Sequence, residues 1–311
     1  MVIALLAGGT GGAKLAAGLR DLLERRGAGE LRVIANTGDD IEIYGVHVSP
    51  DPDLISFRLA GVLDERGFGI AGESHGEMDR RRSAGEDIWF ELGDEDLAVC
   101  RSRAAALAAG SKLTEAHRSA TASYDTGVAT VLPMSDQPVR TIVETTAGDR
   151  PLQEFLIRDR GAGEITGVRF DGIDAALPTL DVLDAISSAD AVVIGPSNPV
   201  ISIQPILELG GLRDALAAAA APVVAVSPFV EGEVLKGPTA AFMTALGYSA
   251  GNAGAMDFYA GLIDGFVADS APDGGTVHVT DVRMADSAGQ LRLAEAVADF
   301  AAELSGRRLV R

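Results

Sequence analysis

An apolar stretch that runs directly into a glycine-rich segment constrains the fold of this chain more than any other feature. Val2–Ala7 reads as a strand buried on both faces, and the sequence GGTGGAK follows it at 8–14. An amphipathic helix is predicted from Lys14 to about Leu23. Glycines allow close backbone approach, and a helix start offers unpaired N–H groups with a partial positive charge, which suits an anion. We expect a nucleotide phosphate to contact Gly9, Thr10, Gly11, Gly12 and Lys14.

This glycine segment matches neither standard nucleotide-binding fingerprint. The dinucleotide motif G-x-G-x-x-G, started at Gly9, would need glycine where Lys14 stands. A Walker loop would need four residues between its glycines, followed by Lys-Ser or Lys-Thr. Nicotinamide binding and ordinary ATP hydrolysis are therefore disfavoured, and a tight turn without a ligand remains the alternative.

The charge and the cysteine content exclude several classes of protein. The formal net charge of −19 disfavours a nucleic-acid partner, which requires a basic surface. No apolar run is long enough to cross a membrane, and the N-terminus lacks the basic region of a signal peptide. The single cysteine, Cys100, excludes an internal disulfide, and the four histidines fit no nucleophile motif. These features predict a cytoplasmic enzyme.

Strand and helix signals alternate over most of the chain, which indicates an α/β fold with a Rossmann-like parallel sheet and helices on both faces. The strands expected in the sheet are Val2–Ala7, Leu31–Ala35, Ala191–Ile194, Val223–Val226 and Gly265–Ala268. The further helices expected around it are Asp53–Leu63, Leu180–Ser187, Leu212–Ala219, Thr239–Leu246 and Leu291–Leu304.

The middle third of the chain differs from this pattern, because it is richer in charge and glycine. It also contains strand signals that need not join the parallel sheet, at Gly127–Leu132, Thr141–Thr146, Leu152–Ile157 and Gly167–Phe170. We therefore expect residues 1–62 and 176–311 to form a nucleotide-binding core. Residues 63–175 would be an inserted, smaller α+β subdomain that binds an acceptor.

Aspartates follow the second expected strand, in Asn36-Thr37-Gly38-Asp39-Asp40, and recur in Ser49-Pro50-Asp51-Pro52-Asp53. Ligands of open α/β sheets lie beyond the carboxyl ends of the strands, so these carboxylates are expected beside the glycine segment. Carboxylates near a phosphate predict Mg²⁺, which prefers oxygen ligands. The alternative for Asp53 is that it caps the following helix, and the alternative for Asp39 is that it stabilises a turn.

Two further segments are expected at the same edge of the sheet. Ser197 and Asn198 stand between prolines after the fourth strand, where they can present a hydroxyl and an amide to a nucleotide. A simple turn is the alternative. Lys236 stands at an expected helix start, where a cation is unfavourable unless an anion binds there, so it is a candidate phosphate contact.

In the middle third, aromatic and apolar residues stand beside carboxylates in the segments 89–96 and 132–136. Such a wall is suited to a flat heteroaromatic acceptor, although clusters of this kind are also common in protein cores. We expect the acceptor to contact Asp53, Glu91, Asp94, Met134 and Ser135.

Taken in order, these segments resemble the 2-phospho-L-lactate transferase family of coenzyme F-420 biosynthesis. The resemblance runs from the first strand to the final quarter of the chain. The matching stretches are GGTGGAKL (8–15), NTGDD (36–40), HVSPDPD (47–53), WFELGDEDLA (89–98), SKLTEA (111–116), PMSDQPV (133–139), GPSNPVISIQPIL (195–207), SPFVEG (227–232) and KGP (236–238).

The resemblance implies a reaction and its partners. Such enzymes move a phospho-three-carbon-acid group from a guanosine diphosphate donor to the terminal ribityl hydroxyl of the deazaflavin Fo, release GMP and use Mg²⁺. They often form dimers, so a homodimer is implied here. Asp40 and Asp53 would be catalytic, either as metal ligands or by orienting the acceptor hydroxyl. The carried acid, whether lactate, enolpyruvate or glycerate, stays open. Direct in-line attack needs no nucleophilic side chain.

Three positions depart from the pattern of this family. Glu91 and Glu95 stand where members usually carry basic residues, and Cys100 stands where they carry histidine. The departures imply another acceptor, a shifted binding mode, or compensation by Arg80–Arg82, Arg101 or Arg103.

A regulator of the gluconeogenesis-factor group, which binds nucleotide sugars without catalysis, is the main alternative. That group shares the glycine start but continues Asp-Asp with a Gly-Gly-Ser-Ser-Gly run. Here Asp40 is followed by Ile41-Glu42-Ile43-Tyr44, which favours the transferase.

Overall fold

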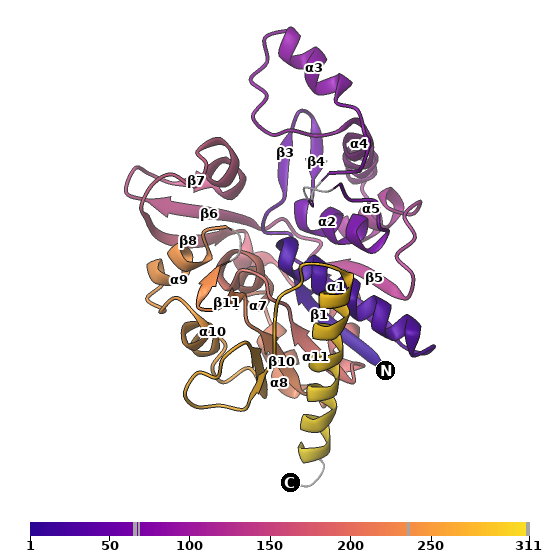
Figure 1. Ribbon diagram of the computed structural model, residues 1–311. Helices are drawn as coiled ribbons and strands as arrows, with labels where there is room; N and C mark the ends of the chain where they lie inside the picture. Colours follow the sequence, from indigo (N-terminus) through magenta and orange to yellow (C-terminus); the bar gives the residue numbers. More distant parts are fainter. Residues whose placement is uncertain (65–66, 68, 235–236, 309–311) are drawn as a thin grey trace.

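A seven-stranded, fully parallel sheet forms the centre of the computed structural model, which describes residues 1–64, 67, 69–234 and 237–308. The spatial order is β14-β13-β10-β9-β1-β2-β5 (Figure 1). The strands are β1 (Val2–Ala7), β2 (Glu30–Ala35), β5 (Ala129–Pro133), β9 (Ala191–Ile194), β10 (Val223–Val226), β13 (Gly265–Ala268) and β14 (Val277–Val279). The five strands expected in the sheet are confirmed.

The order of the strands reverses between β1 and β9. From β1 the chain builds outward through β2 and β5, then returns to β9 on the other side and continues to β14. Loops leaving β1 and β9 therefore diverge at one edge of the sheet. In open α/β sheets, this reversal opens the crevice in which ligands bind.

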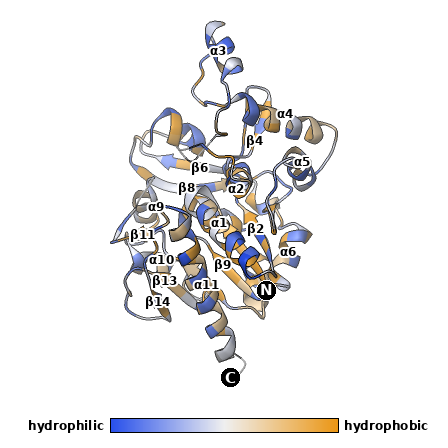
Figure 2. Cartoon of the chain, turned by 45° about the vertical axis from the view of Figure 1, so that its right-hand side comes forward, coloured by the Kyte–Doolittle hydropathy of each residue, from blue (hydrophilic) through white to orange (hydrophobic). Residues whose placement is uncertain are grey.

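Helices cover both faces of the sheet because alternate residues of each strand point to opposite sides. Ile3 and Leu5 pack in one hydrophobic cluster with α1, α2 and α11, whereas Ala4 and Leu6 pack in the other with α6 to α10. Figure 2 shows the hydrophobic residues concentrated on the central strands. The bounds are α1 (Gly9–Arg25), α2 (Pro50–Leu59), α6 (Leu180–Ser187), α7 (Gln204–Leu207), α8 (Leu212–Ala218), α9 (Thr239–Ala245), α10 (Asn252–Phe258) and α11 (Ser287–Arg308).

The middle of the chain builds smaller units around this sheet. A hairpin and three helices form one of them, with a separate hydrophobic cluster that includes Met78, Phe90 and Cys100. An antiparallel sheet of order β7-β6-β8 forms the other. The bounds are β3 (Ile41–Ile43), β4 (Val46–Val48), α3 (Gly76–Ser83), α4 (Asp94–Ala108), α5 (Leu113–Ala120), β6 (Arg140–Thr145), β7 (Arg150–Pro151) and β8 (Ile165–Asp171).

Two expectations for this middle region need correction. The strand expected near 127–132 does join the parallel sheet, since β5 pairs with β2 along its whole length. The strand expected at 152–157 is wrong: Glu154–Arg158 is the single-turn π-helix η1, which buries Phe155 and exposes Ile157. The other short elements are η2 (Ile173–Ala175), η3 (Pro199–Ile203), β11 (Phe229–Val230) and β12 (Glu233–Val234).

Candidate active site

The glycine segment forms the first turn of α1 itself. The helix begins at Gly9, earlier than the Lys14 start expected from the sequence, and Gly8 is its N-cap. Gly9 has a φ of 61°, which favours glycine. A side chain at Gly11 would collide with the carbonyl oxygen of Pro196. The glycines are therefore needed both for the turn after β1 and for the close approach of the loop after β9.

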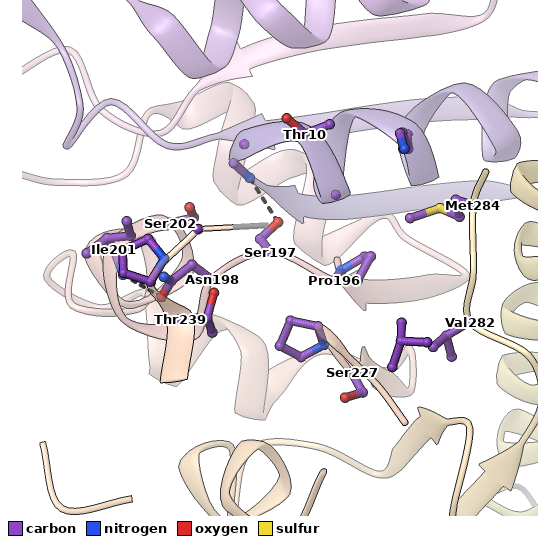
Figure 3. A pocket seen from close by; sticks show the side chains of 18 of the residues that line it. Thr10, Pro196, Ser197, Asn198, Ile201, Ser202, Ser227, Thr239, Val282 and Met284 are labelled. Atoms are coloured by element: carbon purple, nitrogen blue, oxygen red, sulfur yellow. Dashed lines mark hydrogen bonds between the residues drawn. The ribbon is translucent and has the colours of Figure 1, made fainter. Parts of the chain in front are cut away.

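The loop after β9 is tied to this helix start. The Gly8 N–H donates a hydrogen bond to the Ser197 hydroxyl at 3.2 Å (Figure 3). The Asn198 Oδ1 caps η3, accepting from the N–H groups of Val200 at 2.9 Å and Ile201 at 3.3 Å. The two sequence-predicted loops are thus brought together, with their polar groups fixed.

A cavity of about 620 Å³ opens between these two loops. Thr10 and Lys14 of α1, Ser197, Asn198 and Thr239 lie along it, and the segment before α11 closes one side (Figure 3). We name it the donor pocket. Its lining comprises Gly8, Gly9, Thr10, Gly11, Lys14, Asp39, Leu156, Pro196, Ser197, Asn198, Ile201, Ser202, Ser227, Pro228, Val230, Gly237, Pro238, Thr239, Val282, Arg283, Met284 and Ala285.

Two buried carboxylates lie close to the start of α1, and one of them, Asp39, lines the donor pocket. Asn36 Nδ2 donates to Asp39 Oδ1 at 2.9 Å and to Asp51 Oδ2 at 3.0 Å. Asp51 Oδ1 accepts from the Gly9 N–H at 2.6 Å, at the start of α1. Burial, with the nearby charge of Asp51, holds the pKa of Asp39 well above its usual range, and burial raises the pKa of Asp51 to about 6. No separate role was predicted for Asp51, although its place two residues before Asp53 was a usable signal.

Asp40 is held by a different set of partners. Its carboxylate accepts from the Ser49 hydroxyl at 2.8 Å and from His47 Nε2 at 2.9 Å. The other imidazole nitrogen of His47 donates to Glu42 at 3.0 Å, and Arg140 pairs with Glu42 at 2.8 Å. Burial alone would lower the pKa of His47, but its hydrogen bonds to Asp40 and Glu42 raise it to about 9. The imidazole is therefore protonated at neutral pH. The sequence motifs gave no indication of this network.

Asp53 lies at the start of α2 in contact with Arg103 of α4, and Arg103 is fully buried. Burial raises the pKa of Asp53 against the opposing charge of Arg103. Burial also lowers the pKa of the adjacent His117 to about 3, so this ring is neutral. Asp53 Oδ2 is buried and has no hydrogen-bond partner among the described residues.

A second cavity, of about 480 Å³, opens on the far side of Asp53. We name it the acceptor pocket. Trp89 and Phe90 stand in it with their rings edge to face, 5.8 Å between centroids. Its lining comprises Val48, Pro50, Asp53, Leu54, Phe57, Gly69, Glu73, His75, Trp89, Phe90, Glu91, Leu92, Gly93, Asp96, Gln153 and Ile157.

The comparisons with known proteins agree with this geometry. The model of the family described as 2-phospho-L-lactate transferase CofD matches residues 3–289. The chain belongs to this transferase family. A 2-phospho-L-lactate transferase of Halobacterium salinarum is 38% identical, with 97% of this chain and 98% of that protein covered. A phosphoenolpyruvate transferase of Kitasatospora aureofaciens is 39% identical, with 88% of this chain and 86% of that protein covered.

A solved structure supports the fold of this CofD-type transferase. A member of the UPF0052 family from Bacillus halodurans aligns with a TM-score of 0.58 over 95% of this chain and 98% of that one, at 16% identity. At that identity the likeness concerns the fold alone. Along the described part of the transferase, no helix has the length and apolar character needed to cross a membrane.

Several of the expected acceptor contacts of this transferase lie outside the acceptor pocket. Asp94 instead braces the loop before α3, accepting from the N–H groups of Gly76 at 2.8 Å and Glu77 at 3.0 Å. Met134 is buried in the core, and the Ser135 hydroxyl donates to the Leu177 carbonyl at 2.8 Å. Of the expected acceptor contacts, those that line the acceptor pocket are Asp53 and Glu91. Lys236, expected to contact phosphate, lies outside the described residues.

The arginines expected to compensate for the altered motif are engaged with carboxylates. Arg82 pairs with Glu91 at 2.8 Å, and Arg103 pairs with Asp53. Arg101 lies 3.4 Å from Glu77. Cys100 is buried beside Asp96, as expected for a small apolar residue, and burial raises the pKa of its thiol.

The carboxylates of this transferase offer the type of donor that a divalent cation takes, but Asp39, Asp40, Asp51 and Asp53 do not form a described group with three ligand atoms within 4.8 Å. Asp39, Asp40, Asp51 and Asp53 supply buried, hard oxygen donors, and one oxygen of Asp53 has no hydrogen-bond partner among the described residues. Mg²⁺ prefers such oxygens and keeps several waters beside phosphate. Asp53 also lies in the one described group that places three ligand atoms within 4.8 Å, together with Asp96 and Cys100. A thiol is a poor Mg²⁺ ligand, so the oxygens alone match this ion.

Proposed function

We propose that this chain transfers a phospho-three-carbon-acid group, of the 2-phospho-L-lactate or phosphoenolpyruvate type, from a guanosine diphosphate donor to the deazaflavin Fo. GMP would be released and Mg²⁺ required. The relatives named 2-phospho-L-lactate transferase and phosphoenolpyruvate transferase support the class of group transferred. Relatives of both types are similarly close in sequence, so a turnover assay must decide between the two acids.

One observation carries this proposal: the start of α2 lies between the two pockets. Asp51 accepts a hydrogen bond from Gly9, which lines the donor pocket, and Asp53, two residues later, lines the acceptor pocket. The π-helix η1 repeats the arrangement, since Leu156 lines the donor pocket and Ile157 the acceptor pocket. Group transfer between two substrates requires adjacent sites, so that the reacting atoms can be held close together.

Each part of this wall has a role in the proposed reaction. The first turn of α1 would hold the donor diphosphate through its N–H groups, helped by Ser197. Asp40 and Asp53 would hold the cation and orient the terminal acceptor hydroxyl for in-line attack. Mg²⁺, when bound, would neutralise charge on the phosphates. Trp89 and Phe90 would stack against the flat acceptor ring.

The direct test is a turnover assay with Fo, Mg²⁺ and guanosine diphosphate donors that carry lactate, enolpyruvate or glycerate. We expect GMP release together with a phosphodiester product whose mass is that of Fo plus the phospho-acid minus one water. Absence of both products with all three donors would refute the proposal. Thermal stabilisation by GDP, compared with a UDP-sugar and NAD, separates the transferase from a nucleotide-sugar regulator and an oxidoreductase.

A further inference from the structure

The polar part of the acceptor pocket consists mainly of carboxylates that come from separate segments of the chain. Asp53 belongs to α2, Glu73 precedes α3, Glu91 precedes α4, and Asp96 lies in its first turn. His75 and Gln153 complete the polar lining, and no lysine or arginine occurs among the described residues that line this pocket. A ligand entering it therefore meets hydrogen-bond acceptors and negative charge.

The Glu73 carboxylate is built into the wall of this pocket. It accepts from the N–H groups of Ile70 at 2.8 Å and Asp96 at 3.1 Å. It also lies directly against Gly93, where any side chain would collide with it. Burial, and then the charges of Asp53 and Glu73, raise the pKa of Asp96 to about 7, as expected where carboxylates crowd together.

The cations nearest this wall are arranged behind it. Arg103 pairs with Asp53 and donates to the His47 carbonyl at 3.1 Å, and Arg82 pairs with Glu91. Neither arginine lines the pocket. Both neutralise a carboxylate from outside the cavity, where they cannot contact an anionic ligand directly.

We propose that the acceptor pocket selects its ligand by charge: it takes an uncharged aromatic polyol and rejects the same molecule once it carries a phosphate. Hydroxyl groups donate well to carboxylates, whereas a phosphate offers only acceptors and adds like charge. This inference rests on the proposed function. The phosphodiester product of the transfer is then held less tightly than the neutral acceptor, which favours its release.

Riboflavin and its 5′-phosphate, FMN, provide a matched pair of probes, since they share a ring and ribityl chain and differ in the phosphate. Binding to the full chain would be measured by flavin fluorescence at about 0.15 M salt, with EDTA present so that no cation bridges phosphate to carboxylate. We expect riboflavin to bind at least about tenfold more tightly than FMN. Equal or tighter binding of FMN overturns the inference, as does failure of both probes to bind.

Substitutions of the carboxylates that line the acceptor pocket test whether they cause the selectivity. Glu73→Gln and Glu91→Gln should each reduce the ratio of the two affinities severalfold, mainly by improving FMN binding. Glu86→Gln is the matched control, because Glu86 pairs with Arg81 outside the pocket and should leave the ratio unchanged. If Glu73→Gln fails to fold, Glu91→Gln alone decides. An unchanged ratio in every folded variant overturns the inference.

This test and the turnover assay can fail separately. GMP release with Fo but without discrimination between the probes would retain the transferase and remove the charge selection. Selective riboflavin binding without turnover on any guanosine donor would retain the charge selection and remove the proposed transferase activity.

Discussion

Arg103 and Asp53 form an ion pair inside the protein, where the arginine is completely buried and the aspartate is 4% exposed. The pair joins α4, in the middle of the chain, to the first turn of α2 at the wall between the pockets. Arg103 also donates to the His47 carbonyl at 3.1 Å. Arg103 therefore fixes both ends of the segment 47–53, which carries Asp51 and Asp53.

Replacing Arg103 should destabilise the protein strongly, because the buried carboxyl of Asp53 would lose its partner. Arg103→Met is expected to lower the free energy of unfolding by about 3–5 kcal/mol. Adding Asp53→Asn should restore part of the loss, since the unpaired carboxyl is then removed. Urea denaturation measures both. Arg101→Met, at an exposed arginine, is the control and should cost no more than about 1 kcal/mol. An equally small effect at Arg103 would contradict the buried-pair argument.

A side chain at Gly11 should damage nucleotide binding. In Gly11→Ala the new methyl group meets the Pro196 carbonyl, so the two loops of the donor pocket must separate. We expect the affinity for GDP, measured by calorimetry, to fall at least about tenfold. Gly306→Ala, in α11 with no atom near the new methyl, is the control and should be neutral or stabilising by up to about 1 kcal/mol. Unchanged GDP affinity in Gly11→Ala would place the phosphate elsewhere.

The sequence predicted the sheet and the meeting of the loops after β1 and β9, because both depend on local patterns. Val2–Ala7 and Ala191–Ile194 are apolar throughout, which is typical of strands covered on both faces. The loops that follow them must then meet where the strand order reverses. The glycines and Ser197 could therefore be assigned to one pocket before the order of the other strands was known.

The acceptor side could not be predicted to the same extent, since it depends on contacts between distant segments. Nothing local to Arg103 indicates that it pairs with Asp53, fifty residues earlier. Met134 and Ser135 follow a strand, as site residues often do, but that strand lies at the edge of the sheet and its end packs into the core. Asp94 is an ordinary helix-start acid that braces a neighbouring loop.

Removing the charge of Asp40 or Asp53 should slow the proposed transfer. Asp40→Asn and Asp53→Asn keep the size of the side chain but remove a contact to the cation or the acceptor hydroxyl. We expect each to reduce kcat per folded molecule by about a hundredfold or more, with the folded fraction taken from far-UV circular dichroism because Asp53→Asn also leaves Arg103 without its partner. Asp181→Asn is the control, because Asp181 pairs with Arg118 on the surface. If kcat falls by less than about threefold in both Asp40→Asn and Asp53→Asn, these residues do not belong to the reaction centre.

The network around His47 predicts how its contribution to stability depends on pH. The pKa of His47 is raised to about 9 in the folded protein, above the value of about 6.5 in an unfolded chain. Its ion pairs with Asp40 and Glu42 therefore contribute fully below about pH 6.5, and the contribution is lost as the pH rises through 9.

The stability difference between wild type and His47→Gln should accordingly be large at about pH 6 and much smaller at about pH 10. Urea denaturation of the metal-free protein at the two pH values measures it. The hydrogen bond from His47 lowers the pKa of Glu42 to about 2, so Glu42 stays ionised across this range and does not obscure the result. Ser83→Ala, at an exposed hydroxyl that bonds only its own helix, controls for general effects of pH. A His47→Gln difference that stays constant from pH 6 to pH 10 would show that folding does not raise the pKa of His47, and would contradict the ion pairs with Asp40 and Glu42.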